Sequence, residues 1–313
     1  MNMNNKIKSN GILLVSISFA LFYLLQGCAA NLPAVREFSK STIAATSFFD
    51  DIAEDLPKSC ARTAAISFMP SPEDKIEIVN NNVELSTEYR ESLSTCDKYN
   101  DGVNGIVNVN NVLKGYAEAI GKLASDDVVT FTQEVNALRS SLASVGAFQG
   151  EKAEAVVKLA EFLFNAALNG YRQNKLKETI VLAHDDLVEI IEGLTIVTSD
   201  YQAELSKETK NVEQIQRILI NDRKKPEDHR VFKVSVSEID EMLFEFQQKL
   251  NFIQGKNQAA EDYKNILAKI KKAHEKLKVS SDQLDSQQLV LEIRTYAEEL
   301  IPLINDIRKA FSS

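Results

Sequence analysis

The chain has no tryptophan and is poor in the residues that interrupt regular structure, with 6 prolines and 11 glycines among 313 residues. Because proline and glycine are the strongest local breakers, their scarcity predicts long helices. No run of alternating apolar residues is long enough to indicate a strand, and only residues 231–236 are ambiguous. The fold class that these absences leave is all-α.

Catalytic and ligand-binding motifs are missing as well. The three histidines, His184, His229 and His274, show no metal-ligand spacing such as HExxH. GxSxG, SxxK, Walker A and CxxC motifs are absent too. We therefore nominate no catalytic residue, no metal and no cofactor, and we expect a protein that is not an enzyme.

Basic residues are outnumbered by acids, 36 against 45, which gives a formal net charge of −9. Net acidity argues against a nucleic-acid partner, because affinity for nucleic acid comes mostly from basic residues that neutralise phosphates. A hydrophobic fraction of 44 % and a charged fraction of 26 % are typical of a globular protein. The composition thus indicates one large folded domain or two modest ones.

The chain does carry an export signal at its start. Lys6 and Lys8 precede an uncharged apolar run, 11–25, and a small residue, Gly27, stands before Cys28. A basic region, an apolar region and a small residue at the cut describe an exported protein. An ordinary cleaved signal or an uncleaved membrane helix are the alternatives, although the run is short for a span of about 20 residues.

Leu25-Gln26-Gly27-Cys28 resembles the lipobox of bacterial lipoproteins. The resemblance implies that Cys28 is lipidated and that residues 1–27 are removed as a signal peptide, which leaves 28–313 as a helical-bundle domain. Two or three acyl chains anchor a protein stably. Ala29 stands where an Asp would retain the protein in the inner membrane. The implied localisation is therefore the cell envelope, lipid-anchored in the outer membrane and facing the periplasm. No family resemblance is identified for 28–313.

Almost no spacer separates the implied anchor from the folded part. Residues 29–32 are too few for a mobile stalk, and Pro33 suits the first turn of a helix. We therefore expect the bundle to lie close to the membrane.

Two cysteines remain, Cys60 and Cys96. An even number in an exported chain predicts a disulfide, and the alternative is two buried free thiols. The bond would close a loop of about 37 residues and stabilise the fold by about 4 kcal/mol.

Two stretches keep a 3/4 alternation of apolar residues that is typical of helix–helix seams. We expect them to pack against each other in an elongated antiparallel bundle of long helices with coiled-coil-like seams. The first stripe runs from Leu176 to Tyr201 and the second from Ile239 to Leu277.

Several helix boundaries can be predicted from caps and breakers. We expect helices over about 33–55 and 73–99, with Pro57 starting a short helix between them. We also expect a turn or kink at 100–104, a helix capped by Ser125 or Asp126, and one capped by Ser237. The remaining expected breaks are a loop at 146–150, a kink at 169–170, a connection at 221–236 that could also separate two sub-domains, an interruption at 280–282 and a bend at Pro302.

The densest charge feature is a run of six lysines: Lys264, Lys269, Lys271, Lys272, Lys276 and Lys278. It is either a patch for anionic lipid or an acidic polymer, or the solvated back of a bundle helix, and the interspersed acids favour the second interpretation. His274 lies on the second apolar stripe and is expected to be a core histidine with a buried partner. His184 and His229 are expected to be neither ligands nor catalysts.

These observations favour a lipid-anchored cell-envelope binding or scaffolding protein that acts through helical surfaces. Its partners would be membrane lipid, through Cys28, and an envelope protein or polymer. A periplasmic immunity or inhibitor protein is a first alternative, and a peptidoglycan-acting envelope enzyme, or an activator of one, is a second.

Overall fold

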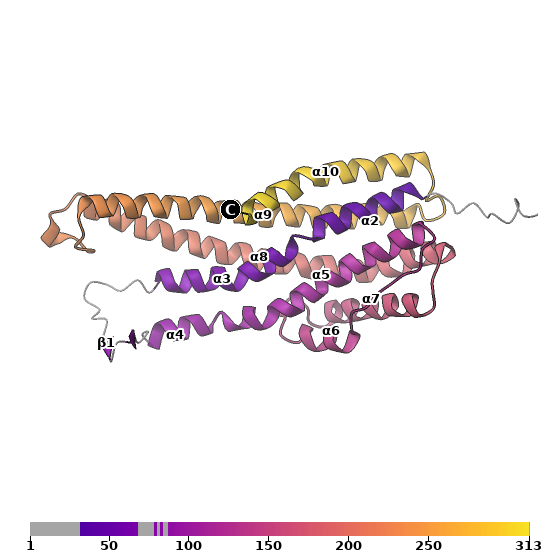
Figure 1. Ribbon diagram of the computed structural model, residues 1–313, viewed down its shortest axis with the longest axis horizontal. Helices are drawn as coiled ribbons and strands as arrows, with labels where there is room; N and C mark the ends of the chain where they lie inside the picture. The colour runs from indigo at the N-terminus through magenta and orange to yellow at the C-terminus, as the bar shows by residue number, and fades with distance from the viewer. Residues whose placement is uncertain (1–31, 68–77, 80–81, 84–86, 313) are drawn as a thin grey trace, which may run out of the picture. The chain divides into compact units, whose positions relative to one another are not determined.

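A computed structural model describes residues 32–67, 78–79, 82–83 and 87–312, and these fold into a helical bundle, as predicted (Figure 1). Leu32–Ser313 is one compact unit, and the connection 221–236 lies inside it. The helices are α2 (Pro33–Thr46), α3 (Phe49–Ser67), α4 (Thr87–Ser94), α5 (Asp97–Ala124), α6 (Val135–Leu142), α7 (Glu151–Leu168), α8 (Leu176–Arg223), α9 (Val236–Val279) and α10 (Gln287–Phe311). Short 3-10 turns at Gln173–Lys175 and Glu227–His229 precede α8 and come after it.

The long helices α8 and α9, of 48 and 44 residues, form an antiparallel pair. Their register is marked by ion pairs from Arg223 to Asp240 and from Glu192 to Lys271. The stripe from Leu176 to Tyr201 is buried throughout. The stripe on α9 is buried from Leu250 onward and half-buried at Leu243 and Phe246. The predicted packing of the two seams is therefore confirmed.

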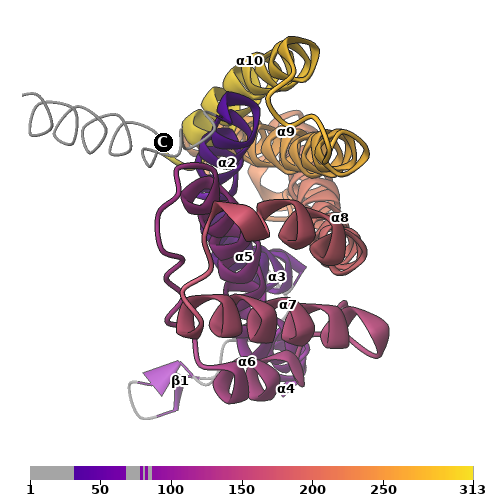
Figure 2. The same cartoon turned by 90° about the vertical axis from the view of Figure 1, so that its right-hand side faces the viewer.

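The other helices cover this pair and one another. α2 packs on α5 and α10, α3 packs on α8 and α5, and α10 also packs along α9. α6 and α7 lie together against α5, and α7 also packs on α8, as the view in Figure 2 shows. Aromatic side chains fill the centre, where the rings of Phe49 and Tyr263 stack with centroids 4.7 Å apart.

Of the expected turn or kink at 100–104, the turn is wrong, because α5 runs through it. Its glycines permit close helix packing and do not end the helix. A Cβ on Gly105 would lie 2.3 Å from the Ser141 carbonyl oxygen, and one on Gly102 would lie 3.4 Å from that of Ser144. A side chain would still fit at Gly102, but only glycine at position 105 allows the end of α6 to approach α5 this closely.

The expected helix over 73–99 is wrong at 78–79 and 82–83, and it is confirmed for most of 87–99, where α4 and the start of α5 lie. Ile78–Val79 (β1) and Asn82–Val83 (β2) form a two-stranded antiparallel pair, and α4 begins only at Thr87. Residues 73–77, 80–81 and 84–86 lie outside the described part of the chain.

Several expected helix starts are wrong as well. Ser125 is the C-cap of α5, and α6 begins only at Val135, so residues 127–134 are not helical. The residue that caps α9 is Ser235, not Ser237, because Ser235 forms a reciprocal capping box with Glu238. The expected single helix over 33–55 breaks after Thr46, and Pro57 lies inside α3 and does not start a helix.

Other boundaries are confirmed. The chain leaves α7 at Leu168 through Gly170, whose φ of +58° suits glycine, and α9 ends before Ser280. The loop at 146–150 separates α6 from α7, and Pro302 lies inside α10.

Candidate functional site

The implied lipidation residue, Cys28, lies outside the described residues. The described chain begins at Leu32, which packs in the core, and α2 starts at the next residue, Pro33.

The predicted disulfide is confirmed. Cys60 on α3 and Cys96, just before α5, are bonded with their Cα atoms 5.8 Å apart.

The six lysines of α9 lie among carboxylates of neighbouring helices. Lys271 binds Glu192 at 3.1 Å, Lys276 binds Glu292 at 3.3 Å, and Lys278 binds Asp185 at 3.5 Å. The remaining ion pairs join Lys264 to Glu261 and Lys269 to Glu299, and Lys272 is exposed. Five of the six positive charges are thus matched by an adjacent acid.

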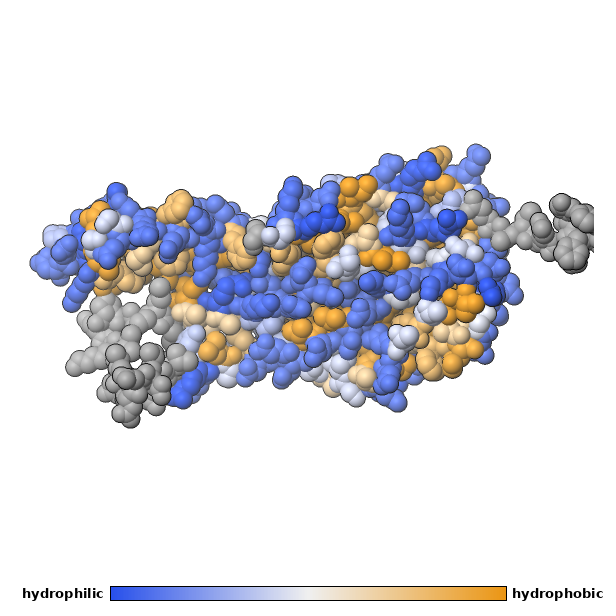
Figure 3. Space-filling view, in the orientation of Figure 1, coloured by the Kyte–Doolittle hydropathy of each residue, from blue (hydrophilic) through white to orange (hydrophobic). Residues whose placement is uncertain are grey.

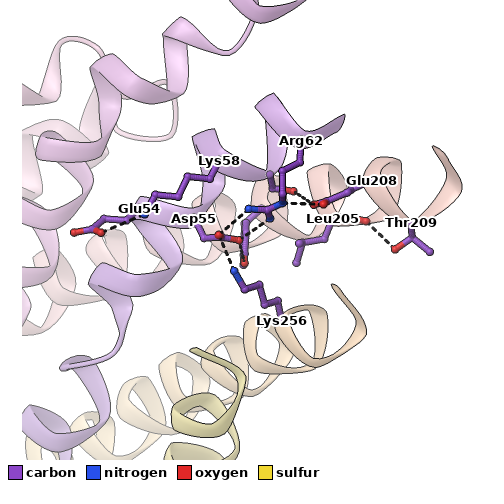
Figure 4. Close-up of polar contacts among 10 residues, drawn as sticks. Glu54, Asp55, Lys58, Arg62, Leu205, Glu208, Thr209 and Lys256 are labelled. Carbon is purple, nitrogen blue, oxygen red and sulfur yellow. Dashed lines mark hydrogen bonds and ion pairs between the residues drawn. The ribbon is translucent and has the colours of Figure 1, made fainter. Parts of the chain in front are cut away.

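A buried ionic cluster joins α3, α8 and α9, and it centres on Asp55 (Figure 4). The Lys256 ammonium donates to Asp55 Oδ1 at 2.7 Å, and the Tyr201 hydroxyl donates to Oδ2 at 2.7 Å. The Arg62 guanidinium donates to both oxygens, at 3.1 and 3.0 Å. Three helices therefore meet at one carboxylate.

Arg62 extends the cluster to a second buried acid. Its Nε donates to Glu208 Oε1 at 2.8 Å, and the Ser59 hydroxyl donates to Glu208 Oε2 at 3.0 Å. Two acids and two bases balance each other. Every oxygen of Asp55 and Glu208 accepts at least one hydrogen bond, which is what burial of charge requires.

The electrostatics of the cluster follow from burial and pairing. Burial would raise the pKa of Asp55, but hydrogen bonds from Arg62, Lys256 and Tyr201 together hold it below its usual value. Burial lowers the pKa of Lys256, and its bond to Asp55 only partly opposes this. Burial and the Asp55 charge raise the pKa of Tyr201. Each charged side chain of the cluster is therefore paired, and none of them is left as a free base or nucleophile.

Sequence reasoning missed this cluster, although one signal was present. The α8 stripe continues beyond Tyr201 through Leu205 and Val212, and the residue that keeps the 3/4 step between these two is Glu208. An acid on an apolar stripe indicates a buried partner of opposite charge.

A second series of buried, hydrogen-bonded side chains links α5, α9 and α8. The Tyr116 hydroxyl lies 2.5 Å from His274 Nε2, and the Nδ1 atoms of His274 and His184 lie 3.0 Å apart. His184 Nε2 in turn lies 2.7 Å from Glu275 Oε2, which is half exposed. The expected buried partner of His274 is thus confirmed as Tyr116 together with His184.

Its hydrogen bonds are all satisfied when both imidazoles are neutral. Glu275 can only accept, so His184 donates from Nε2 and accepts at Nδ1. His274 then donates from Nδ1 and accepts at Nε2 from the Tyr116 hydroxyl. Burial lowers the pKa of His274 to about 3, and the nearby Lys278 charge and the neighbouring His184 add to this effect. Burial also lowers the pKa of His184.

Other features bear on the site. His229 is exposed beside Asp228. Among the residues that the structure describes, no group of three or more His, Cys, Asp or Glu side chains could hold a metal ion. Within the same ranges, no helix combines the length and apolarity needed to cross a bilayer.

Comparison with protein-family models, curated proteins and solved structures finds no match.

Proposed function

We propose that this chain is a lipid-anchored cell-envelope protein that binds or scaffolds an envelope protein or polymer through its helical surfaces and catalyses no reaction. Its anchor is acylated Cys28, its location the outer membrane on the periplasmic side, and nucleic acid is not a partner. The lipobox supports the anchor. The buried acids support a non-catalytic role, since Asp55 and Glu208 already accept hydrogen bonds from buried donors.

The observation that carries the binding role is the far end of the α8–α9 hairpin. α3 ends at Ser67, which is bonded to Asn211 at 2.7 Å, and α10 ends at Phe311, whose ring lies beside Lys256. Beyond these levels α8 and α9 continue as a pair (Figure 1).

This part of the hairpin, from Asn211 to Arg223 and from Val236 to Lys256, exposes large apolar side chains. Phe244 is 66 % exposed, Ile220 45 % and Val236 41 %. Figure 3 shows apolar residues among hydrophilic ones at this end. Exposed apolar side chains on two paired helices are suited to a protein–protein contact.

A photo-crosslinking amino acid at position 244 tests this role in intact cells. We expect one discrete adduct, which excess wild-type protein abolishes by competition and excess Phe244→Ser protein does not. The matched control is Ile196, an apolar residue of α8 that is 43 % exposed but lies away from the hairpin end. Identical adducts from both positions, or none from 244, would contradict the proposal. An adduct with an enzyme that the protein inhibits would specify the immunity alternative.

Cys28→Ser tests the anchor separately. Its thiol is the acceptor of the lipid, so the variant should stay an uncleaved precursor that incorporates no labelled fatty acid. A variant that still matures and partitions with detergent would show that the lipoprotein assignment is wrong.

A further inference from the structure

We propose that the end of the bundle at which α2 begins contacts the bilayer, with Leu168 and Val279 entering the membrane interface. This inference rests on the proposed lipid anchor and specifies how the folded part meets the membrane. The partner is the lipid surface itself, recognised by apolar insertion.

The short segment between Cys28 and the folded part determines which end of the bundle lies at the membrane. Cys28 precedes the buried residue Leu32 by four positions, and four residues extend at most about 14 Å. An acylated Cys28 therefore has to hold the start of α2 close to the headgroups. Side chains at this end lie within reach of the interface, whereas the far end of the α8–α9 hairpin reaches it only if the bundle lies flat on the membrane.

This end holds the starts of α2, α8 and α10 and the ends of α5, α7 and α9, and it faces the viewer in Figure 2. Gln173, before α8, donates to the carbonyl of Ala124 at the end of α5, at 3.4 Å. Lys177, in the first turn of α8, pairs with Asp282 between α9 and α10. The Arg172 guanidinium donates to the carbonyl of Asp126 at 2.6 Å. These contacts join the three connections 122–127, 172–178 and 278–285 into one end face.

The end face displays apolar side chains. Val279 is 75 % exposed and Leu168 is 69 % exposed, which are the highest values among the large apolar residues that the structure describes. Each is the last residue of its helix, α9 and α7 respectively. Both exposed side chains therefore lie at the end of the bundle, at the level of the three connections.

Charge on this face points to neutral lipid and not to an anionic polymer. The three connections carry five basic and five acidic residues, which leaves no excess of positive charge to attract anions. These residues are Lys122, Arg172, Lys175, Lys177 and Lys278 against Asp126, Asp127, Glu178, Asp282 and Asp285. Contact should therefore be insensitive to salt and should not require anionic lipid.

Environment-sensitive fluorophores on the lipidated full-length protein test the orientation. Single substitutions Leu168→Cys and Val279→Cys are labelled, and the matched control is Phe244→Cys, also apolar and 66 % exposed, near the opposite end of α9. Cys60 and Cys96 are bonded to each other and do not react. The protein is reconstituted into phosphatidylcholine vesicles that contain lipid with a spin-label quencher.

We expect blue-shifted emission and a loss of fluorescence by quenching at 168 and 279 but not at 244, unchanged by added salt. Flotation with the vesicles reports anchoring independently. A floated protein whose probes at 168 and 279 are not quenched overturns the orientation and leaves the anchor intact. Equal quenching at all three positions overturns it too. A protein that does not float overturns both.

Discussion

Asp55 accepts hydrogen bonds from Lys256, Arg62 and Tyr201, which places residues of three helices on one carboxylate. Removing a single partner of a buried ion pair leaves an uncompensated charge, which costs about 3–5 kcal/mol. Asp55 is therefore the residue whose replacement should damage the bundle most.

Asp55→Ala should lower the free energy of unfolding by about 3–5 kcal/mol, because Lys256 and Arg62 would lose their counter-charge. Chemical denaturation measures it. The control is Glu54→Ala, whose carboxylate is 61 % exposed and pairs only with Lys58, and it should cost less than about 1 kcal/mol. Similar losses in both variants would show that the cluster has no special role in stability.

His274 predicts a pH dependence. Its pKa is about 3 in the folded state and 6.5 when unperturbed. Between these values the unfolded chain binds more protons, so stability falls as pH falls. Acidification from pH 7 to pH 5 should cost about 2 kcal/mol through this residue.

Denaturation of wild type and variants at pH 7 and pH 5 checks this dependence. His274→Gln should be less stable at pH 7, because Tyr116 and His184 lose their partner. It should nevertheless lose less stability on acidification than wild type. His229→Gln, which replaces an exposed histidine, should leave the pH dependence unchanged. An unchanged slope in His274→Gln would refute a buried neutral imidazole.

At the scale of the element, the α8–α9 seam is the feature that could be predicted best from the sequence. Its 3/4 alternation persists for many turns, and burial of a long stripe leaves few alternative arrangements. The glycines of α5 could not be interpreted in this way. Whether Gly105 ends a helix or admits Ser141 of a neighbouring helix depends on a contact between segments far apart in sequence.

The partners of buried polar residues could not be predicted from the sequence either. His274 could be assigned to the core from its place on the stripe, but its partners, His184 and Tyr116, come from two other helices. The partners of Asp55 are likewise fixed by the three-dimensional arrangement. Periodicity along one helix predicts that a residue is buried, and it does not predict which residue it meets.

Leu250→Asp should destabilise the seam by several kcal/mol, because Leu250 is 7 % exposed and a charge there would have no partner. Thermal melting by circular dichroism measures the loss. Phe244→Asp, on the same helix but 66 % exposed, is the matched control and should melt as wild type does. Equal melting temperatures for Leu250→Asp and wild type would mean that the seam does not hold the helices together.

At the scale of the whole molecule, the disulfide joins α3 covalently to the start of α5 across 36 positions. Closing a loop of this length stabilises the fold by about 4 kcal/mol in the chain-entropy estimate. The double variant Cys60→Ser/Cys96→Ser should lose about that much free energy of unfolding, measured by denaturant titration. Wild type in reducing agent should match the variant. If the reductant destabilised the double variant as much as it destabilises wild type, the effect would not be due to this bond.

The same bond keeps the molecule in one piece if the polypeptide is cut between Cys60 and Cys96. The amino-terminal fragment would keep Cys28, α2 and α3, and the carboxy-terminal fragment would hold α5 to α10. The sulfur bridge would still hold both fragments together, so a nicked molecule would migrate as one species on a non-reducing gel and as two after reduction. If Cys28 carries the proposed lipid, a partner bound at the proposed hairpin site would stay attached to the membrane through the Cys60–Cys96 bond even after the backbone had been cut.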